Sequence, residues 1–573
     1  MNGDSVARDV DSGLASWVLA RTASHLLART AGAASAAEGE GHACALLEGF
    51  DEAEFEALRA HAWVGAGDGF TPFVLDAARR RFWLWRNWRH EQRLADALRA
   101  RCDARVQLLS ADAVARDVDA LFAGSDARKT SDQRAAVAVV PGTRFFVLTG
   151  GPGTGKTTTV LRMLLMLLRH AVACGLPEQP SIALAAPTGK AARHLAASVA
   201  RGKADLATQL AAGSGFAGLL DAIPHEHAST LHRLLGYRPH LNGFAYGAGE
   251  SLPADVVVVD EASMVDLAMM RQLVEALAPT SLLILLGDPD QLASVDAGSV
   301  LADIVASERS EASPLRGQVA SLHQAWRAGG ALQQAIEAIR DGEPGWSARR
   351  SGTEEGVVLR ECADAAVLHA RVEAWLDRRA EAHARLFGGI EAPAAFAILR
   401  EAQVLCALRD GPFGARGVNS HIVARLAECH GFDAGRAWYH GRPVIVTRND
   451  YAHGLFNGDL GIALDGTEGL RVWFESADRA GAGWRSFPPR ALPACETAWA
   501  ITIHRSQGSE YGDVAVVLPP EVEHRLLSRE LLYTAVSRAR RSAELWAVPA
   551  ALETALARRV ARHGGLRDRL AAP

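Results

Sequence analysis

A glycine-rich segment with one lysine and several hydroxyl side chains is the part of this sequence that most directly suggests chemistry. It consists of Gly150, Gly151, Pro152, Gly153, Thr154, Gly155, Lys156, Thr157 and Thr158. An apolar run, 145–148, precedes it and an amphipathic run follows it, so a strand, a glycine loop and a helix are expected in that order. Backbone N–H groups of such a loop and the helix N-terminus bind phosphate oxygens. Lys156 would then reach the β- and γ-phosphates of a nucleoside triphosphate, and Thr157 would hold Mg²⁺.

Two adjacent carboxylates supply the second half of this chemistry. Asp260 and Glu261 directly follow the apolar run 256–259, which predicts a buried strand. Ligands collect at the carboxyl edge of an open α/β sheet, so both side chains are expected to face the phosphates. Asp260 would hold Mg²⁺, directly or through water, and Glu261 would polarise the attacking water, which favours hydrolysis over transfer. A solvated acidic turn is the alternative, but the phosphate loop requires a motif of this kind.

Two further polar residues have the character of hydrolysis groups. Gln291 follows the apolar run 283–286 and is placed to sense the γ-phosphate. Arg538 lies far downstream, within 533–540, and could act as an arginine finger that stabilises transition-state charge. The alternative for Arg538 is a structural arginine on a helix, and sequence position does not separate the two interpretations.

Composition limits the class of protein. A chain of 573 residues is too long for one hydrophobic core and predicts three or four domains. The net charge of -5 does not favour nucleic-acid binding by the whole surface, so any nucleic acid would occupy a local groove. The seven cysteines contain no CxxC pair, which argues against zinc and iron-sulfur sites and predicts reduced thiols. The charged N-terminus and the interrupted apolar runs predict a soluble, cytoplasmic protein with no membrane contact.

The chain divides into regions of different pattern. Residues 1–125 are rich in Ala, Leu and Arg with helical periodicity and predict a separate helical domain. Within it, 79–89 mixes arginines with tryptophans. These could stack on bases, but buried tryptophans with solvated arginines are the favoured interpretation. The C-terminal arginines are interpreted as a charged helix face rather than a specific site, and comprise Arg558, Arg559, Arg562, Arg567 and Arg569.

Alternating strand-like and helical runs predict parallel sheets covered by helices. The strand-like runs are 145–148, 182–185, 256–259 and 282–286 in a first lobe, and 404–408, 514–518 and 545–548 in a second. A polar, glycine-containing stretch, 341–356, predicts a surface loop. Between the later runs, 442–493 contains short strands with glycine turns, for which a small β-barrel inserted in the second lobe is expected.

Several further segments occur in an order that is typical of one protein family. They are 186–192 (APTGKAA), 229–236 (STLHRLLG), 260–266 (DEASMVD), 287–292 (GDPDQL), 456–459 (FNGD) and 502–510 (TIHRSQGSE). With these motifs the chain resembles superfamily 1 helicases and, within them, the RecD family, the alpha subunit of exodeoxyribonuclease V. The resemblance runs from about residue 133 to residue 546.

The resemblance implies an α/β fold with two RecA-like P-loop domains, expected at 126–315 and 316–573. It also implies a helical N-terminal domain at 1–125 that docks onto a partner, and an SH3-like β-barrel insertion at about 440–493. Segments 41–47 and 83–91 resemble the amino-terminal domain of the family. Residues 237–251 fall where the family carries a short pin hairpin, and their Asn242-Gly243 pair suits its turn.

The resemblance also assigns roles to individual residues. Gln133 would read the adenine, and Gln291, Arg327 and Arg538 would contact the γ-phosphate region. Single-stranded DNA would be contacted by Thr188, Lys190, His232, Asn457, Thr502, His504 and Ser506. Three positions depart from the family pattern: Ala328 follows Arg327 where an aromatic is usual, Arg505 replaces lysine, and Ser537 replaces threonine.

The function implied is an ATP- and Mg²⁺-dependent 5′-to-3′ DNA helicase. It would work with RecB-like and RecC-like subunits in a heterotrimer that unwinds and processes double-strand breaks for homologous recombination. Its partners would include single-stranded DNA and duplex ends. Two alternatives are a stand-alone RecD-like helicase and an assembly subunit with a dormant motor. A metabolic kinase shares the phosphate loop but has no use for segment 502–510. Carboxylates at nuclease-like spacing are absent from the sequence, so nuclease activity is expected in another subunit.

Overall fold

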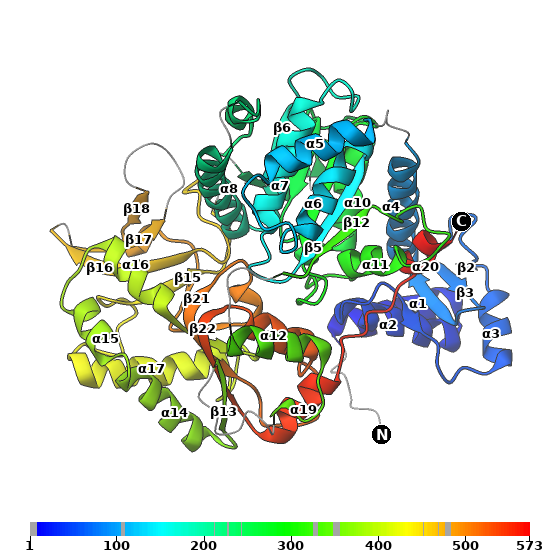
Figure 1. Ribbon diagram of the computed structural model, residues 1–573. Coiled ribbons are helices and arrows are strands. Elements are labelled where there is room, and N and C mark those ends of the chain that lie inside the picture. Colours follow the sequence, from blue (N-terminus) through cyan, green and yellow to red (C-terminus); the bar gives the residue numbers. More distant parts are fainter. Residues whose placement is uncertain are drawn as a thin grey trace.

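The computed structural model describes residues 8–104, 109–210, 213–225, 228–241, 243–324, 330–347, 356–450, 452–467, 469–475 and 483–572. Figure 1 shows two α/β lobes and an N-terminal domain, with α8 (Gly189–Gln209) between the first lobe and a separate antiparallel sheet. Within these ranges no helix has both the length and the apolar character needed to cross a bilayer.

The first lobe is built on a six-stranded parallel sheet in the order β12-β5-β11-β10-β6-β7. Its strands are β5 (Phe145–Gly150), β6 (Ile182–Ala186), β7 (Ala228–Thr230), β10 (Val256–Val259), β11 (Leu282–Gly287) and β12 (Val319–Leu322). Alternate strand residues enter two hydrophobic cores, one on each face of the sheet, as expected for a parallel sheet covered on both sides. The four strands predicted for this lobe are confirmed.

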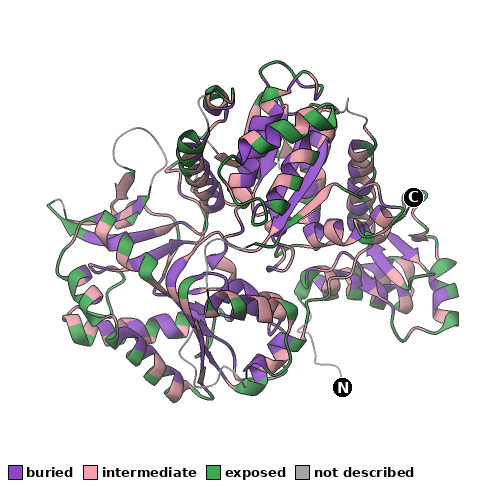
Figure 2. Ribbon diagram, viewed as in Figure 1, coloured by how far each residue is buried: buried purple, intermediate pink, exposed green. Residues whose placement is uncertain are grey.

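Helices cover both faces of this sheet (Figure 2). The helices around it are α5 (Ala111–Leu121), α6 (Ser131–Val139), α7 (Lys156–Arg169), α8, α9 (Leu231–Leu234), α10 (Leu267–Ala276) and α11 (Val300–Ser307). Val118 and Leu121 of α5 share a core with α7, and β12 pairs with β5. The first lobe therefore extends beyond both expected limits, 126 and 315, because tertiary contacts rather than local pattern define its ends.

The second lobe contains a five-stranded parallel sheet in the order β13-β22-β21-β14-β20. Its strands are β13 (Val357–Glu361), β14 (Ala402–Cys406), β20 (Ala500–Thr502), β21 (Tyr511–Val517) and β22 (Ala539–Ala547). Its helices are α12 (Ala331–Asp341), α14 (Ala365–Asp377), α15 (Ala380–Phe387), α16 (Ala392–Glu401), α17 (Ala415–His430), α18 (Arg529–Val536) and α19 (Pro549–Ala557). The three strands predicted for this lobe are found, each beginning earlier in the chain than predicted. Much of the predicted loop 341–356 lies outside the described residues.

The region expected to form a barrel contains a five-stranded antiparallel sheet in the order β18-β17-β16-β15-β19. Its strands are β15 (Pro443–Val446), β16 (Leu460–Gly466), β17 (Gly469–Glu475), β18 (Trp484–Phe487) and β19 (Cys495–Thr497). Val444, Val472 and Phe474 form part of a small core of its own. An antiparallel sheet is thus present where the small β-barrel was predicted, and its closure into a barrel stays a prediction.

The N-terminal domain is less purely helical than predicted. It contains α1 (Asp9–Thr22), α2 (His25–Gly39) and α3 (Glu52–Arg59), together with the start of α4 (Trp85–Asp103). It also contains a four-stranded sheet made of β1 (Ala45–Leu46), β2 (Val64–Gly65), β3 (Phe73–Asp76) and β4 (Arg81–Leu84). Phe82 and Trp83 are fully buried while Arg79 and Arg80 are exposed, as the favoured interpretation of segment 79–89 predicts, whereas Trp85 and Trp88 are only half-buried.

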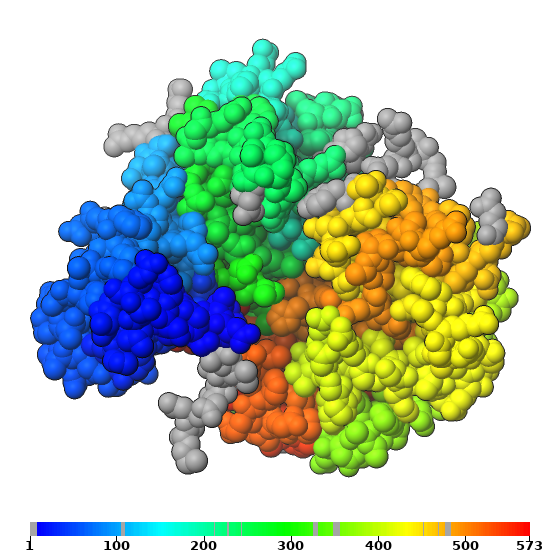
Figure 3. Space-filling view, turned by 180° about the vertical axis from the view of Figure 1, so that it is seen from behind, coloured from blue at the N-terminus to red at the C-terminus, as the bar shows by residue number. Residues whose placement is uncertain are grey.

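The C-terminal strap, residues 558–572, crosses from the second lobe to the N-terminal domain (Figure 1). It ends in α20 (Leu566–Ala571), which packs against α4 and α11. The Ala43 amide donates to the carbonyl of His563 at 2.7 Å, and the Arg562 guanidinium donates to the carbonyl of Asp296 at 2.8 Å. The expectation of a solvated helix face is therefore wrong for Arg562, because its charge is used to tie the strap to backbone carbonyls. Figure 3 shows the N-terminal domain, in blue, against the green first lobe.

A short hairpin is present where the pin was expected. β8 (Tyr237–Arg238) pairs with β9 (Gly243–Phe244) in antiparallel register. Gly243 opens β9 instead of lying in the turn, because Arg238 pairs with Gly243, and Asn242 lies outside the described residues.

Candidate active site

The phosphate loop joins β5 to α7 as predicted. Gly153 and Gly155 have φ of 76° and 84°, in the left-handed region that favours glycine, so the loop can turn its N–H groups inward. Lys156 is the first residue of α7, and its Nζ donates to the carbonyls of Gly150 at 2.5 Å and Gly151 at 3.1 Å. The lysine charge is thus held directly over the loop.

Asp260 and Glu261 lie at the carboxyl end of β10. The Asp260 carboxylate accepts a hydrogen bond from the Glu261 amide at 2.8 Å. Glu261 has φ of 53° and ψ of 40°, a left-handed conformation that is strained for a residue with a side chain and that clusters at functional sites. Burial raises the pKa of Asp260, opposed by the Lys156 charge. Burial and the Asp260 charge raise the pKa of Glu261, opposed by Arg538 and Lys156.

One cavity of about 300 Å³ brings these groups together between the two lobes. Its walls include residues 152–158, Asp260, Glu261, Gln291 and Arg538. Thr157 and Asp260 both face it, and their hydroxyl and carboxylate oxygens are the hard donors that Mg²⁺ prefers. Gln133 lies beside it in α6, with its Nε2 donating to the carbonyl of Thr154 at 3.3 Å. The phosphate loop, the carboxylates, Gln291 and Arg538 therefore meet at one place.

Arg538 reaches the first lobe through Gln291. One guanidinium nitrogen donates to Gln291 Oε1 at 2.7 Å, and Nε donates to the carbonyl of Thr534 at 3.0 Å. Ser537 Oγ accepts from the same guanidinium at 3.3 Å, so the serine retains the hydroxyl contact at a position where the family usually has threonine. Arg327 and its neighbour Ala328 lie outside the described residues.

Further contacts between the lobes involve residues that the sequence did not single out. They surround the interlobe loop, residues 288–292 of the first lobe. The Tyr533 hydroxyl of α18 donates to Asp288 Oδ2 at 2.8 Å, and the Leu292 amide donates to Thr534 Oγ1 at 2.9 Å. Gln507 Nε2 donates to the carbonyl of Leu292 at 3.1 Å. Tyr533 is the first residue of segment 533–540, which contains Arg538, but no local pattern shows that its hydroxyl crosses to the other lobe.

Two of the residues assigned to the DNA path lie at the start of α8. Thr188 caps this helix, its hydroxyl accepting from the Ala191 amide at 3.2 Å. Lys190 is half-buried, and burial lowers its pKa to about 8 although Asp459 opposes the shift. Arg193, one turn further along, forms an ion pair with Asp459, which directly precedes β16 of the antiparallel sheet. This part of α8 therefore contacts the insertion in the second lobe.

The other assigned residues are dispersed. Thr502 ends β20 and lines a cavity of about 590 Å³, whereas Ser506 is fully buried with its hydroxyl donating to the carbonyl of Ile503. His504 lines a separate cavity beside the strap, and burial and Arg562 lower its pKa. His232 packs against the rings of the hairpin, and Asn457 is exposed. Within segment 502–506, Thr502 and His504 therefore line different cavities, and the Ser506 side chain lies in the interior.

The cavity at Thr502 is rich in cations, of which the sequence motifs had included only Arg505. We call it the arginine groove, after Arg409, Arg416, Arg436, Arg442 and Arg505. The one carboxylate among the described residues that line it, Glu496, is 2.7 Å from Arg409 and 2.8 Å from Arg416, and it also pairs with Arg505. Burial raises the pKa of Glu496, but hydrogen bonds from these arginines outweigh it and lower the pKa to about 2.

Comparisons with known proteins identify the family. Residues 133–297 match a model described as an AAA domain, and residues 497–545 match a UvrD-like helicase C-terminal domain. The RecBCD enzyme subunit RecD of Mycobacterium tuberculosis is 41% identical over 492 residues, covering 86% of this chain and 80% of the relative. The chain belongs to the RecD family. The RecD subunit of Haemophilus influenzae is 32% identical over 528 residues, covering 84% of this RecD-family chain and 79% of the relative.

More distant relatives also match this RecD-family chain. The ATP-dependent RecD2 DNA helicase of Deinococcus radiodurans is 33% identical over 455 residues, covering 76% of the chain and 53% of that protein. A solved structure of Pif1 helicases at forked DNA covers 73% of the chain and 91% of its own, with a TM-score of 0.34 and 16% identity.

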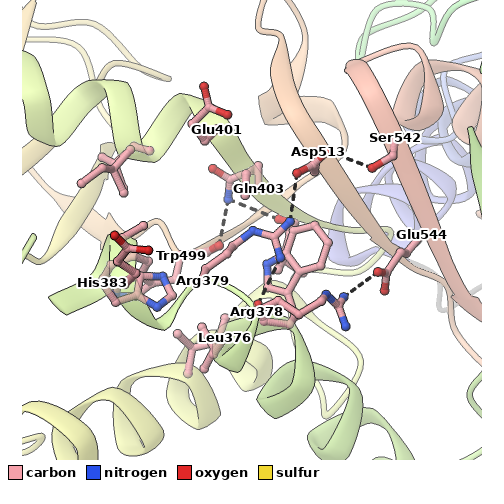
Figure 4. Close-up of a pocket in the computed structure, with 18 of the residues that line it drawn as sticks. Leu376, Arg378, Arg379, His383, Glu401, Gln403, Trp499, Asp513, Ser542 and Glu544 are labelled. Atoms are coloured by element: carbon pink, nitrogen blue, oxygen red, sulfur yellow. Dashed lines mark hydrogen bonds and ion pairs between the residues drawn. The ribbon is translucent and has the colours of Figure 1, made fainter. Parts of the chain in front are cut away.

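A further cavity of this RecD-family chain, of about 610 Å³, lies in the second lobe (Figure 4). Its charged side chains pair with one another: Arg379 is 3.2 Å from Asp513 and Arg378 is 2.5 Å from Glu544. The Arg379 guanidinium also stacks on Trp375 at 3.5 Å from the ring centroid. The described side chains that line it include none of the sequence-predicted site residues, so the cavity between the lobes remains the candidate site.

Proposed function

We propose that this chain is an ATP-driven DNA helicase and the RecD subunit of a RecBCD-type complex that processes double-strand breaks. The observation that carries the proposal is the single cavity in which the phosphate loop and Glu261 of one lobe face Arg538 of the other. A site divided between two lobes changes its geometry when the lobes move, which is what a motor driven by nucleotide hydrolysis requires.

Each side chain has a definite task in hydrolysis. Lys156 exchanges its loop carbonyl partners for β- and γ-phosphate oxygens, and Thr157 and Asp260 would hold Mg²⁺, which neutralises phosphate charge when bound. Glu261 orients the attacking water and accepts its proton. Lys156 and Arg538 oppose the effect of burial on the Glu261 pKa, so they favour the ionised carboxylate that this task requires.

The remaining groups complete the nucleotide site. Gln291 and Arg538 meet where charge develops on the γ-phosphate. Gln133 borders the loop at the place proposed for the adenine. Arg327 is proposed as a third γ-phosphate contact on the family resemblance, since it lies outside the described residues.

Single-stranded DNA is proposed to follow Thr188, Lys190, His232, Asn457, Thr502, His504 and Ser506. The arginine groove at Thr502 supports this path, because it concentrates positive charge on a chain whose net charge is -5. Arginine contacts to phosphates give affinity that is independent of base sequence and that weakens with salt. Ser506 would take part through the backbone position it stabilises, since its side chain is buried.

The finer organisation belongs to the same proposal. The two parallel-sheet lobes are proposed to be RecA-like motor domains, and the antiparallel sheet an SH3-like barrel. The N-terminal domain is proposed to dock onto a RecC-like subunit of a cytoplasmic heterotrimer that also contains a RecB-like subunit. Translocation is proposed to run 5′ to 3′.

The test is unwinding of two matched duplexes, one with a 5′ and one with a 3′ single-stranded tail, by the purified chain with ATP and Mg²⁺. Opening of only the 5′-tailed duplex is expected. Opening of only the 3′-tailed duplex would overturn the polarity and leave a helicase. Hydrolysis on single-stranded DNA without unwinding would indicate a translocase that needs its partners, and copurification with two larger proteins would separate a complex subunit from a stand-alone helicase.

A further inference from the structure

The interlobe loop is held by the second lobe at four points. Asp288 accepts from Tyr533, Gln291 accepts from Arg538, and the backbone of Leu292 bonds to Thr534 and Gln507. The Leu292 side chain packs into the hydrophobic core of the second lobe. A loop of one lobe that the other lobe binds through three residues, by side chain and by backbone, is expected to follow that lobe when the cleft changes shape.

Asp288 is the buried charge at the centre of this contact. It is 3% exposed, and the donors recorded to its carboxylate are the Tyr533 hydroxyl at 2.8 Å, Gln291 Nε2 at 3.1 Å and the Asp290 amide at 3.1 Å. All three donors are neutral. A buried carboxylate stabilised by neutral donors depends on each of them, because an unsatisfied buried charge is costly.

These bonds also fix which way the Gln291 amide faces. Nε2 donates to Asp288 and Oε1 accepts from Arg538, and only one orientation of the amide satisfies a carboxylate and a guanidinium together. The Tyr533 hydroxyl therefore orients Gln291 through Asp288, without touching Gln291 itself. The chain of contacts runs from α18 of the second lobe into the first lobe and back to Arg538 of the second.

Tyr533 also lies against the phosphate loop. A Cβ placed on Gly151 would be 3.0 Å from the Tyr533 hydroxyl oxygen. The phosphate loop therefore comes close to the phenol ring at a position where glycine leaves room for it. The side chain is 2% exposed. Burial and Asp288 raise the pKa of Tyr533 well above its usual value, so the hydroxyl remains a neutral donor at physiological pH.

We infer that Tyr533 is a positioning residue for ATP hydrolysis: its hydroxyl holds Asp288, which orients Gln291 against Arg538 when the lobes are closed. The inference rests on the proposed ATPase function and assigns one more residue to it. Removing the hydroxyl leaves the nucleotide contacts of the phosphate loop in place but loosens the orientation of Gln291. The cost is therefore expected in the rate of hydrolysis and not in nucleotide binding.

The experiment compares Tyr533→Phe with Tyr439→Phe at saturating single-stranded DNA. Tyr439 is the control for loss of a buried hydroxyl: it is also buried in the second lobe, and its hydroxyl accepts a hydrogen bond from the Trp499 indole at 3.1 Å. Tyr533→Phe is expected to lower kcat about tenfold with KM for ATP within twofold of wild type, whereas Tyr439→Phe keeps both values. A kcat within twofold of wild type in Tyr533→Phe, or equal losses in the two variants, would overturn the inference.

A double-mutant cycle with Asp288→Ala tests the route of the effect. If Tyr533 acts through Asp288, adding Tyr533→Phe to Asp288→Ala changes kcat by less than twofold. A full tenfold further loss would show that Tyr533 acts independently and would refute the relay. Retained binding of a fluorescent ADP analogue shows that each variant is folded. Absence of DNA-stimulated hydrolysis in wild type would instead overturn the proposed function and this inference together.

Discussion

The backbone of Glu261 allows its structural and chemical roles to be separated by two substitutions. Glu261→Gln and Glu261→Asn both remove the carboxylate, and both remove the like charge next to Asp260. They differ in how well they tolerate φ of 53° and ψ of 40°. Asparagine adopts the left-handed region far more readily than glutamine, because its short side chain bonds the local backbone. The two variants should therefore be equally inactive but unequally stable.

The expected magnitudes follow from this geometry. The left-handed conformation costs roughly 1–2 kcal/mol for a residue with an ordinary side chain. If asparagine recovers about 1 kcal/mol of this, Glu261→Asn should unfold about 2–4 °C above Glu261→Gln for a lobe of this size. Loss of the general base should lower kcat by about 10²–10⁴-fold in both variants.

Differential scanning calorimetry of the free protein and steady-state hydrolysis on single-stranded DNA measure the two effects, and binding of a fluorescent ADP analogue is the control for an intact phosphate loop. Equal melting temperatures for the two variants would refute the assignment of strain to Glu261. Hydrolysis by Glu261→Gln at more than a tenth of the wild-type rate would refute its assignment as the base.

Three further outcomes are expected. Burial and Asp260 raise the pKa of Glu261. The stability that this group contributes is therefore fully present below its unfolded pKa of about 4.3 and is lost as pH rises through the raised value. Between pH 4 and pH 8, the free energy of unfolding measured in urea should fall less in Glu261→Gln than in wild type. Glu496, with a pKa of about 2, contributes stability that is present above about pH 4.3 and lost as pH falls towards 2, so the free energy of unfolding of Glu496→Gln should fall less below pH 4.3 than that of wild type. Because the substitution also frees Arg505, it should tighten single-stranded DNA binding, with a steeper salt dependence in fluorescence titrations. Lys156→Gln should abolish hydrolysis and still copurify with its partner subunits, whereas loss of assembly would favour a scaffold role.

The sequence was sufficient to predict those parts of the fold that depend only on neighbouring residues. The phosphate loop was predictable because glycines, a lysine and hydroxyls occur within a few residues between a strand and a helix. The buried run 256–259 was predictable because a parallel strand covered on both faces is apolar throughout. The two carboxylates proposed for catalysis followed from that strand, because its carboxyl end lies at the ligand edge of the sheet.

What was missed depends on contacts between distant residues. The sheet of the N-terminal domain consists of strands too short to show a clear period, such as β1 and β2. The burial of Ser506 depends on a 3-10 turn that points its hydroxyl inward. Arg562 was interpreted as a solvated cation because nothing near it in the sequence shows that carbonyls more than 200 residues away would bind it. Tyr533 was missed for the same reason.

The strap has a consequence for how the protein is made. Glu91 of α4 is a buried carboxylate that accepts from the Trp83 indole at 3.1 Å and from the Gly565 amide at 2.8 Å. Residues 91 and 565 are 474 positions apart, which at about 5–20 residues per second separates their synthesis by roughly 24–95 s. During that interval the N-terminal domain contains a carboxylate that lacks one of its donors. A translation product that stopped before Gly565 would therefore leave the Glu91 carboxylate without this donor, so the N-terminal domain is completed only after the glycine has been synthesised.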